Sequence, residues 1–584
     1  MLKIVLAVLA LLIPARALAG EAQEQALDAL VADYEAFALA DDPIAAGQYG
    51  DRAALSKLPD VTPQAGARRA AALTGFRTRL SAIATSGLSE EERLNRAFLA
   101  RVIDDRLRGL ALDQARLDVF FADSGFHTLA PYLAGVTPID DAADAEAYVA
   151  RLEALPGYWA DNMENARRAV RTGFTQTAAT TATVMTQVRR QTETPVEDDP
   201  LIAPLKRLPG DIPAARREAL RQRGLAAVRD LRVRQREFIT FLETDYLPAA
   251  RPALGIGSAV GGREYYRYAV AHYTTTDLTP DEIHRIGLSE VARIRAEMET
   301  TMRETGFKGT FPEFLAYLRS DPRFYATSRQ DLLEKASEIA KRIDDQLPRW
   351  FATLPRLTYG VRPVPADIEE TYTTGRYFPG SARLGVAGGY MVNTSHLDQR
   401  PLYELPALTL HEAVPGHHLQ IALAQELEDV PTFRRNADMT AFVEGWGLYS
   451  EKLGLEMGVY RDPYERFGRL SYEMWRACRL VADTGIHWMG WTMDQARACF
   501  TENTALSPHN IETELARYVS WPGQALAYKI GEMKILELRA RAERELGPKF
   551  DIRRFHDAVL LAGPLPMDLL ETRIDNWIAT ERQR

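Results

Sequence analysis

The chain has 584 residues, of which 26% are charged, and its formal net charge is −9. Acidic and basic residues are interspersed along it, which argues against a nucleic-acid-binding surface and against a basic face for a membrane. Cys478 and Cys499 are the two cysteines. Export would permit a disulfide between them, but buried free thiols fit the sequence equally well.

Residues 1–19 have the pattern of a secretory signal peptide. Lys3 precedes an apolar run from Ile4 to Ile13, and Ala17-Leu18-Ala19 forms a small-x-small cleavage site. The run is too short to span a bilayer, and no cysteine follows the site to carry a lipid anchor. We therefore expect an exported protein, periplasmic in a bacterium, without stable membrane insertion.

Two helical regions follow the signal peptide. Residues 20–270 contain long segments with apolar residues at three- and four-residue spacing, which predicts an N-terminal helical lobe. Gly-rich turns near its end indicate a junction. Thr279 and Pro280 then have the pattern of a helix start, with acidic residues in the first turn. We assign residues 271–584 to a second lobe, which holds the candidate catalytic residues.

Residues 357–394 differ in composition from the rest of the chain. Pro, Gly, Tyr, Thr and Val dominate them, and this is the one region that predicts β-structure. It shortly precedes the sequence His411-Glu412-Ala413-Val414-Pro415-Gly416-His417-His418. A small sheet beside that segment is the expected arrangement.

The segment from His411 to His418 resembles the zinc-binding helix H-E-x-x-H, but position i+4 is Pro415. Because Pro415 lacks an N–H and Gly416 readily leaves helical geometry, the turn can bulge and return His417 over His411. His418 would lie roughly 10 Å along an unbroken helix and is the alternative ligand. A surface histidine pair after a broken helix is the non-metal interpretation.

A third ligand and a base complete the expected metal site. Glu444 lies inside the apolar stretch Ala441-Phe442-Val443-Glu444-Gly445-Trp446, where an ionised carboxylate has to be paired or coordinated. A salt bridge to an arginine is the other explanation. Glu451, seven residues later on the same helical face, suits a supporting or solvent role. Glu412 is the candidate general base, because it adjoins His411 without being a ligand.

Polar residues recur in the C-terminal helices. Arg476, Arg479, Asp483 and His487 are spaced three and four residues apart and so share one face, which suggests either the wall of a cleft or an internal Arg–Asp ladder. His487 is a candidate donor to a developing oxyanion. Arg517 joins Arg476 and Arg479 as a candidate substrate-binding residue.

These motifs together resemble a bacterial family, domain of unknown function 885. The shared residues are His411-Glu412, Pro415-Gly416-His417-His418-Leu419-Gln420, Glu444-Gly445-Trp446, the segment around Arg479 to His487, and Trp521-Pro522-Gly523-Gln524-Ala525 with Tyr528-Lys529-Ile530-Gly531. The Phe-Val-Glu segment is also similar to the third-ligand helix of thimet-oligopeptidase-type enzymes, which are grouped with angiotensin-converting enzyme as Glu-zincins. The resemblance implies a zincin fold and a metal more firmly than a substrate.

The Glu-zincin resemblance also implies roles for two further regions. An edge strand above the metal helix binds the substrate backbone in such enzymes, and we assign Gly388–Asn393 to that role, with Gly389, Tyr390 and Asn393 as candidate contacts. A structural hairpin is the other interpretation. A late tyrosine hydrogen-bonds the tetrahedral intermediate in such enzymes, and Tyr528 occupies the matching place. A buried tyrosine bonded to a carbonyl is the alternative.

The sequence thus predicts a mainly α protein with two helical lobes flanking a deep cleft and a small sheet beside the metal helix. One Zn²⁺ per chain, held by His411, His417 and Glu444, would hydrolyse short peptides, with Glu412 as base and His487 and Tyr528 stabilising the oxyanion. An amidase acting on cell-wall peptides or small conjugates, and a silent peptide-binding protein, are the alternatives. No nucleic-acid partner is expected, and oligomeric state and end preference stay open.

Overall fold

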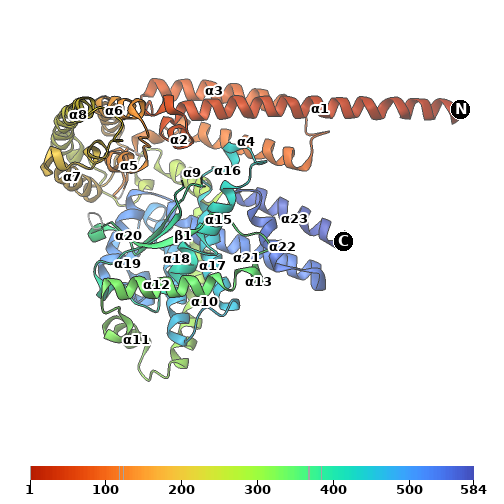
Figure 1. Cartoon of the computed structure of the whole chain (residues 1–584). Helices are drawn as coiled ribbons and strands as arrows, with labels where there is room; N and C mark the ends of the chain where they lie inside the picture. The colour runs from red at the N-terminus through yellow and green to blue at the C-terminus, as the bar shows by residue number, and fades with distance from the viewer. Residues whose placement is uncertain (1, 118, 123, 366–368, 383–384) are drawn as a thin grey trace. The chain divides into compact units, whose positions relative to one another are not determined.

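The computed structural model describes residues 2–117, 119–122, 124–365, 369–382 and 385–584, with side chains from residue 20 onward except at 130, 131, 136 and 371. The predicted signal peptide therefore has no described side chains and stays a prediction. The protein is mainly helical, as predicted, with one small sheet (Figure 1). Its contacts divide it into two compact units, Met1–Tyr265 with Val519–Trp521, and Tyr266–Tyr518 with Pro522–Arg584. Within the described residues, no helix is both long and apolar enough to cross a membrane.

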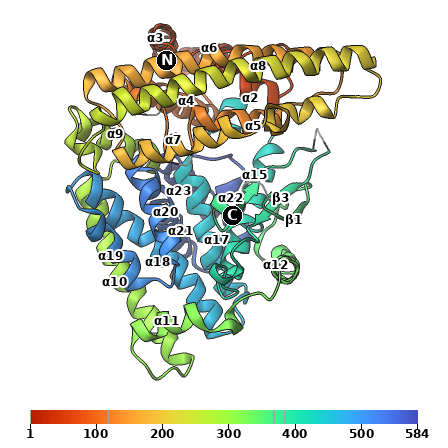
Figure 2. The same ribbon diagram turned by 90° about the vertical axis from the view of Figure 1, so that its left-hand side faces the viewer.

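The first unit is built from helices and short 3₁₀ turns. Its helices are α1 (Leu2–Asp41), α2 (Pro43–Gln48), α3 (Pro63–Ala82), α4 (Glu90–Ala111), α5 (Leu129–Val136), α6 (Ala142–Thr172), α7 (Ala178–Glu193) and α8 (Ala214–Phe241), while α9 (Gly262–Thr274) spans the division. Helices α6, α7 and α8 lie side by side (Figure 2). Their core includes the edge-to-face rings of Phe126, Trp159 and Phe238, an arrangement that aromatic pairs favour.

The second unit contains the remaining helices around the sheet. They are α10 (Pro280–Glu304), α11 (Phe311–Ser320), α12 (Arg329–Asp344), α13 (Leu347–Trp350), α14 (Leu405–Glu412), α15 (His417–Gln425), α16 (Thr432–Arg435), α17 (Thr440–Glu456), α18 (Pro463–His487), α19 (Met493–Asn503), α20 (Pro508–Ser520), α21 (Ala527–Leu546), α22 (Ile552–Leu560) and α23 (Met567–Gln583). The predicted start of α10 is confirmed, because Thr279 and Glu282 form a capping box with Pro280 in the first turn.

The sheet lies inside the predicted β region and has the order β1-β3-β2, formed by Tyr359–Pro363, Gly388–Val392 and Gly375–Phe378. Strand β1 runs parallel to β3, and β2 runs antiparallel to it. The prediction that Gly388–Asn393 forms an edge strand is therefore wrong. Sequence order places this segment last of the three, but pairing on both sides makes it the middle strand, and β2 is an outer strand.

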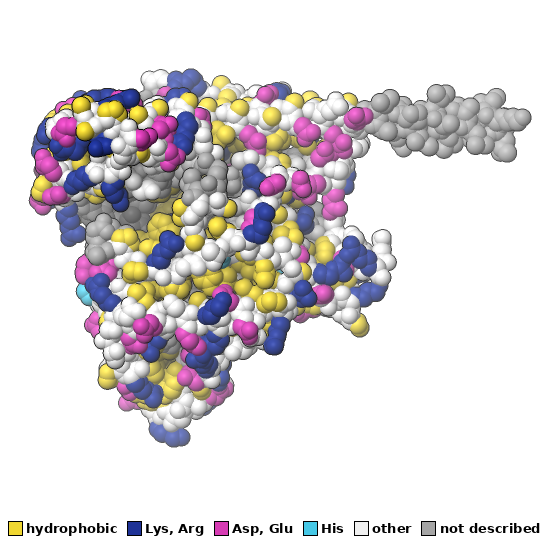
Figure 3. All heavy atoms as spheres, in the orientation of Figure 1, with side chains coloured by type: hydrophobic (Ala, Val, Ile, Leu, Met, Phe, Trp, Pro, Cys, Tyr) yellow, Lys and Arg dark blue, Asp and Glu magenta, His cyan; other side chains and the backbone are white. Residues whose placement is uncertain are grey.

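One face of the sheet packs against the helices that carry the histidine motif. The Tyr390 hydroxyl lies 3.2 Å from Thr409 Oγ1 on α14, and the Tyr377 hydroxyl lies 3.0 Å from His418 Nδ1 on α15. The opposite face carries Arg376 and the exposed Phe378 of β2. On the side of the molecule drawn in Figure 3, basic and acidic side chains are mixed, which agrees with the dispersed charge of the sequence.

Candidate metal centre

The histidine motif is split between two helices. Helix α14 ends at Glu412 and α15 begins at His417, so residues 413–416 interrupt the helix as the Pro-Gly pair predicts. A Cβ on Gly416 would lie 1.9 Å from the carbonyl oxygen of His411, so a side chain at this position would clash with backbone. This close turn brings the rings of His411 and His417 to a centroid distance of 4.6 Å.

Three possible ligand atoms converge beside this turn. Glu444 Oε2 on α17 lies 3.3 Å from His411 Nε2 and 3.4 Å from His417 Nε2. A tetrahedral zinc with bonds of about 2.0–2.1 Å has its ligand atoms roughly 3.3–3.4 Å apart. The separations from the carboxylate to both imidazoles fit such an ion, and among the described residues this group has ligand atoms that all lie within 4.8 Å of one another. The chain therefore offers two nitrogens and one carboxylate oxygen to a single cation.

Glu451 contacts His411 on the side of the ring away from Glu444. Its Oε1 lies 2.8 Å from His411 Nδ1, and because a carboxylate accepts, Nδ1 carries the hydrogen and Nε2 faces Glu444. Arg476 Nη2 lies 3.3 Å from the same carboxylate oxygen. Burial lowers the pKa of His411, but Glu444 and Glu451 outweigh it and raise that pKa to about 9. Burial opposes ionisation of Glu444, yet His417 and His411 hold its pKa well below the usual value.

His418, the alternative ligand, is held by the sheet side of the protein. Its Nε2 donates to the Leu357 carbonyl at 3.0 Å, so its Nδ1 accepts from the Tyr377 hydroxyl. Burial lowers its pKa to about 4, which agrees with a neutral ring bonded at both nitrogens. The structure therefore brings His417, and not His418, to His411 and Glu444.

The candidate base lies at the outer edge of β2. Glu412 Oε2 accepts a hydrogen bond of 2.7 Å from the backbone N–H of Tyr377, which is not used in pairing with β3. This bond fixes one carboxylate oxygen and leaves the other without a bond from the described residues. Glu412 and His411 are neighbours at the end of α14, so the base and the first ligand share a rigid support.

Glycines on α17 allow the helix to approach closely on two sides. A Cβ on Gly447 would lie 2.5 Å from His411 Cε1, and a Cβ on Gly445 would lie 2.5 Å from the backbone of Gly531 on α21. Between them, the indole N–H of Trp446 donates to the Pro415 carbonyl at 2.7 Å. Helix α17 is thereby fixed against both the histidine turn and α21, which sets the position of Glu444.

Several residues predicted to contact the substrate have hydrogen-bond partners inside the protein. Asn393 Nδ2 donates to three carbonyls of residues 369, 372 and 373, and Tyr390 is buried in the middle strand together with Gly389. Arg479 binds Glu514 at 2.8 Å and the Tyr518 hydroxyl at 2.9 Å. The side chains of Asn393 and Arg479 are thus bonded inside the fold, and the substrate contacts assigned to these residues stay predictions.

The other residues predicted for the site, all in the C-terminal helical region, also contact neighbouring protein groups. Arg476 supports Glu451 as described, and Arg517 Nη2 donates to Gln524 at 2.8 Å. His487 Nε2 donates to the Tyr518 carbonyl at 2.8 Å, so this nitrogen is engaged within the helical core, and the oxyanion role of His487 stays a prediction. Tyr528 is buried beneath the Arg479 guanidinium, 4.2 Å from its ring centroid.

A buried cluster of charges lies in the helices α10, α18 and α21. Lys529 Nζ binds Glu532 at 2.7 Å, Glu473 at 2.8 Å and Glu290 at 3.0 Å, and Arg293 pairs with Glu473 as well. These carboxylates raise the pKa of Lys529 against the effect of burial. No role of this kind was predicted for the Tyr-Lys-Ile-Gly motif, because Glu473 and Glu290 come from distant segments.

The sequence also missed two residues beside Glu412. Arg376, an exposed residue, precedes Tyr377 on β2, and its guanidinium lies against surrounding protein near the Tyr372 hydroxyl. Burial by surrounding protein lowers the pKa of Arg376, but Tyr372 and the carboxylates of Glu412 and Glu444 raise it above its ordinary value. The feature of the sequence that could have indicated these two residues is an arginine next to aromatic residues in the predicted β region.

The cysteine question is settled in favour of a bond. Cys478 on α18 and Cys499 on α19 form a disulfide, with Cα atoms 5.7 Å apart. It joins two helices of the second unit.

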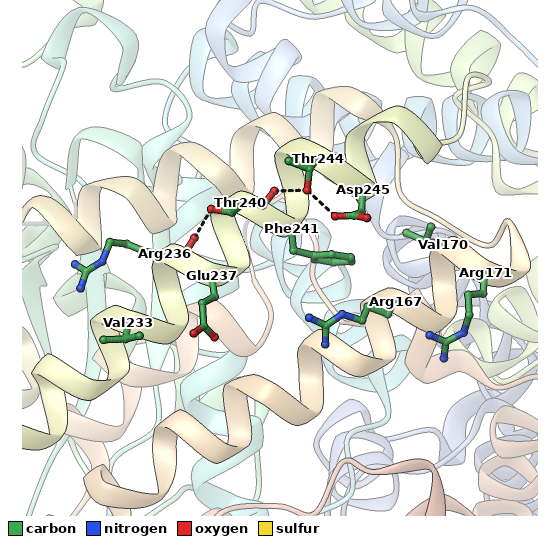
Figure 4. Close-up of a pocket in the computed structure, with 10 residues that line it drawn as sticks. All are labelled: Arg167, Val170, Arg171, Val233, Arg236, Glu237, Thr240, Phe241, Thr244 and Asp245. Atoms are coloured by element: carbon green, nitrogen blue, oxygen red, sulfur yellow. Dashed lines mark hydrogen bonds between the residues drawn. The ribbon is translucent and has the colours of Figure 1, made fainter.

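A hollow in the first unit lies away from the candidate metal ligands along the chain. It has a volume of about 640 Å³ and lies between α6 and α8, with Arg167 over the ring of Phe241 at 5.4 Å (Figure 4). Its charged side chains project from open helix surfaces, and Arg171 is paired with Glu164 at 2.8 Å. We place the candidate chemistry at the converging ligands rather than at this hollow.

Comparison with known proteins agrees with this architecture over almost the whole chain. A protein provisionally described as a lipoprotein from Colwellia psychrerythraea is 27% identical, with a TM-score of 0.90 over 96% of this chain and 99% of that one. A protein of unknown function from Shewanella oneidensis, provisionally described as a lipoprotein, is 18% identical, with a TM-score of 0.70 over 94% of this chain and 99% of that one, and shows the fold alone. No curated protein matches. Residues 43–574 match the family described as bacterial protein of unknown function DUF885. The chain therefore belongs to this DUF885 family.

Proposed function

We propose that the protein is a zinc-dependent hydrolase of short peptides. The observation that carries this proposal is the approach of Glu444 Oε2 to His411 Nε2 and His417 Nε2 at 3.3 and 3.4 Å. Three protein ligands that leave a coordination position open are typical of catalytic zinc rather than of structural zinc. Glu451 adds the outer carboxylate that such histidines usually have.

The chain supplies a base in the right chemical setting. A bound zinc ion would provide Lewis acidity, polarising a carbonyl and acidifying water. Glu412, fixed through one oxygen by the Tyr377 N–H, keeps its other oxygen to take a proton from the attacking water. The same carboxyl then delivers the proton to the leaving nitrogen as the C–N bond breaks. These are the two proton transfers that amide hydrolysis needs.

The outer strand β2 suits an extended substrate better than β3 does. It borders Glu412 through Tyr377, whereas β3 is paired on both sides. A peptide could lie along this edge with its scissile carbonyl near Glu412. Tyr528 stays the proposed oxyanion donor. The predicted zincin likeness and the deep cleft between lobes also stay proposals.

An extracytoplasmic location fits the chemistry of the chain. The disulfide between Cys478 and Cys499 is stable in an oxidising compartment, and residues 1–19 have a signal-peptide pattern. The neighbour from Colwellia psychrerythraea, described provisionally as a lipoprotein, points to the cell envelope as well. We propose an exported, envelope-associated protein, with the periplasm as its compartment.

Two other functions use the same residues. A zinc-dependent amidase acting on cell-wall peptides or small conjugates would share the ligands and base, because the pocket rather than the metal sets the substrate. A peptide-binding protein without catalytic activity would need the metal ligands but not Glu412 as a base.

The deciding experiment uses purified mature protein, stripped of metal and reloaded with Zn²⁺. We expect about one Zn²⁺ per chain by elemental analysis, and cleavage of a mixed short-peptide library read by mass spectrometry. His411→Ala and Glu444→Ala should lose both the metal and the cleavage, while His418→Ala should keep the metal. Undiminished zinc in a His411→Ala, Glu444→Ala double variant would overturn the metal site. Retained zinc without cleavage of any peptide would favour the amidase or the binding protein.

A further inference from the structure

Arg376 is an accessible cation beside the candidate base. Its backbone directly precedes Tyr377, whose N–H contacts Glu412 at 2.7 Å, so consecutive Cα positions place it about 3.8 Å from Tyr377 along β2. Its side chain is exposed on the outer face of the strand, where it lies 5.7 Å from the ring centroid of Phe378. No carboxylate of a described residue lies within ion-pair distance of it. The charge is therefore available to an anionic ligand.

Tyr372 adds a second donor at the same place. Its hydroxyl oxygen is buried and lies near enough to the Arg376 guanidinium to accept a hydrogen bond from it, while no described residue accepts the proton of the hydroxyl. Burial raises the pKa of this hydroxyl although Arg376 lowers it, so the group stays protonated and can donate. A buried polar group without a partner costs stability, and such groups are rare unless a ligand or water satisfies them. Guanidinium and hydroxyl together form a donor pair suited to an anion.

The surrounding charges restrict which anion can bind. The charges of Glu412 and Glu444 act on Arg376, so a second anion has to be held at Arg376 and away from them. A planar carboxylate matches the fork of a guanidinium, which binds it through two parallel hydrogen bonds. Every unmodified peptide carries one such group at a fixed distance from its last peptide bonds.

We propose that Arg376 and Tyr372 bind the free carboxyl terminus of the peptide, so that the enzyme releases short fragments from carboxyl ends. This inference rests on the proposed function and names its substrate class. Because the binding pair lies next to the base, and an extended residue spans about 3.3–3.6 Å, only a few residues fit between the terminus and the bond that is cleaved. In each turnover water adds to the scissile carbonyl carbon, the C–N bond breaks, and Glu412 transfers the proton to the leaving amine, while the terminal carboxylate stays unchanged.

The sheet provides a matched control for the charge. Arg362 on β1 pairs in register with Met391, which also pairs in register with Arg376 on the other side. The two arginines therefore project from the same rung and face of the sheet, both exposed. Arg362 has no ion pair among the described residues either. Removing it deletes the same charge without altering the residue next to Tyr377.

Binding tests this proposal without requiring turnover. In a zinc-loaded Glu412→Gln background, calorimetry would compare one short peptide as the free acid and as the carboxyl-terminal amide. We expect the free acid to bind about 10–100-fold more tightly, as loss of a charged hydrogen-bonded pair implies. Arg376→Gln should remove this preference by weakening the acid alone, Arg376→Lys should restore part of it, and Arg362→Gln should leave it intact. Equal binding of acid and amide, or equal weakening of both by Arg376→Gln, would overturn the proposal.

Two further measurements distinguish failure of this inference from failure of the proposed function. An amidated peptide with an aspartate near its end tests for a side-chain carboxylate, and binding as tight as that of the free acid would overturn recognition of the terminus. Parental protein that cleaves acid and amide peptides with equal kcat/KM keeps the proposed function but contradicts this inference. If no peptide is hydrolysed while the Glu412→Gln protein still prefers the acid, the carboxylate site stands and the peptidase assignment fails. Zinc content and circular dichroism of Arg376→Gln establish that the variant is folded.

Discussion

The two units of this chain share a helical architecture but differ in what their cores contain. The first unit packs rings such as those of Phe126, Trp159 and Phe238, and its ion pairs are largely at the surface, as between Arg223 and Glu153 at 2.9 Å. Arg251, one of its buried cations, bonds backbone carbonyls. The second unit instead buries whole sets of opposite charges around Lys529 and around His411.

The difference indicates which unit is organised around a site. Buried ion pairs give little net stability compared with apolar packing, because desolvation offsets their attraction. Their groups are however held in defined directions, as Glu451 holds His411. The second unit carries the desolvation cost of buried ion pairs, and the first unit largely avoids it. Such a core is expected where the orientation of side chains matters for function. Four perturbations test this contrast.

The largest effect should follow from changing the base. Glu412→Gln removes the proton acceptor while keeping an oxygen for the Tyr377 N–H, so we expect peptide hydrolysis to fall by about 10²–10⁴-fold. Zinc content should be unchanged, because Glu412 is not one of the three proposed ligands. The exposed Glu428, changed to Gln, is the control for charge and should leave kcat/KM as it is. Parental activity in Glu412→Gln would remove Glu412 from the mechanism.

The second perturbation compares the cores directly. Lys529→Met leaves the carboxylates of Glu290, Glu473 and Glu532 without their shared cation, and the free energy of unfolding should fall by about 3–5 kcal/mol. Arg223→Met, which removes an exposed pair in the first unit, should cost about 0–1 kcal/mol. Urea unfolding midpoints measure both. Similar midpoints for the two variants would contradict the contrast between the units.

The third perturbation uses pH. Burial raises the pKa of Glu404 to about 8, although Arg476 and Arg400 lower it, and Glu404 Oε1 has no hydrogen-bond partner among the described residues. A carboxyl whose pKa is raised by folding favours the folded state when protonated. Its contribution is therefore full below the unfolded pKa, about 4.5, and is lost as the pH rises to about 8.

We accordingly expect the parent protein to lose at most roughly 5 kcal/mol of stability through Glu404 between these pH values, at about 1.4 kcal/mol per pKa unit. Glu404→Gln should flatten this part of the pH profile. The exposed Glu197, changed to Gln, serves as control and should leave the profile unchanged. A parallel decline in Glu404→Gln and parent would show that other groups cause it.

The smallest effect concerns Glu451, the outer carboxylate of the candidate metal site. Glu451→Gln still offers an oxygen to His411 Nδ1 but no charge, so zinc affinity should fall by about 10–100-fold with the three ligands in place. Glu456→Gln on the same helix, which removes a surface partner of Arg539, should not change the affinity. Competition with a metal-sensitive dye measures the dissociation constants. Equal affinities for both variants would confine Glu451 to a structural role.

The sequence predicted those features that depend on local chemistry. Pro415 and Gly416 indicated a broken helix, and the structure does bring His417 back beside His411 with Glu444 as third neighbour. The helical content and the location of the sheet followed from spacing and composition in the same way. Local patterns were sufficient because each of these features arises within a few turns of the chain.

Features that depend on distant partners were missed or misassigned. Strand order is set by pairing and not by sequence order, so the middle strand was taken for an edge. Arg479 and His487 looked available on a polar helix face, but Glu514 and the Tyr518 carbonyl bind them. Arg376 and Tyr372 came near Glu412 only through the fold of β2. The sequence could not assign these partners, because they come from segments that local spacing does not connect.

The glycines of α17 have a consequence for how such a protein can diversify. Helical glycine costs roughly 1 kcal/mol relative to alanine, yet Gly445 and Gly447 let the helix backbone touch Gly531 and the His411 ring. The position of Glu444 on α17 is thus set by these close contacts at Gly445 and Gly447 and does not depend on the other side chains around it. Substitutions on the sheet, where Arg376 and Phe378 project outward, leave these contacts untouched. New substrate preferences could therefore arise on one wall of the site while the ligand geometry on the other is inherited unaltered.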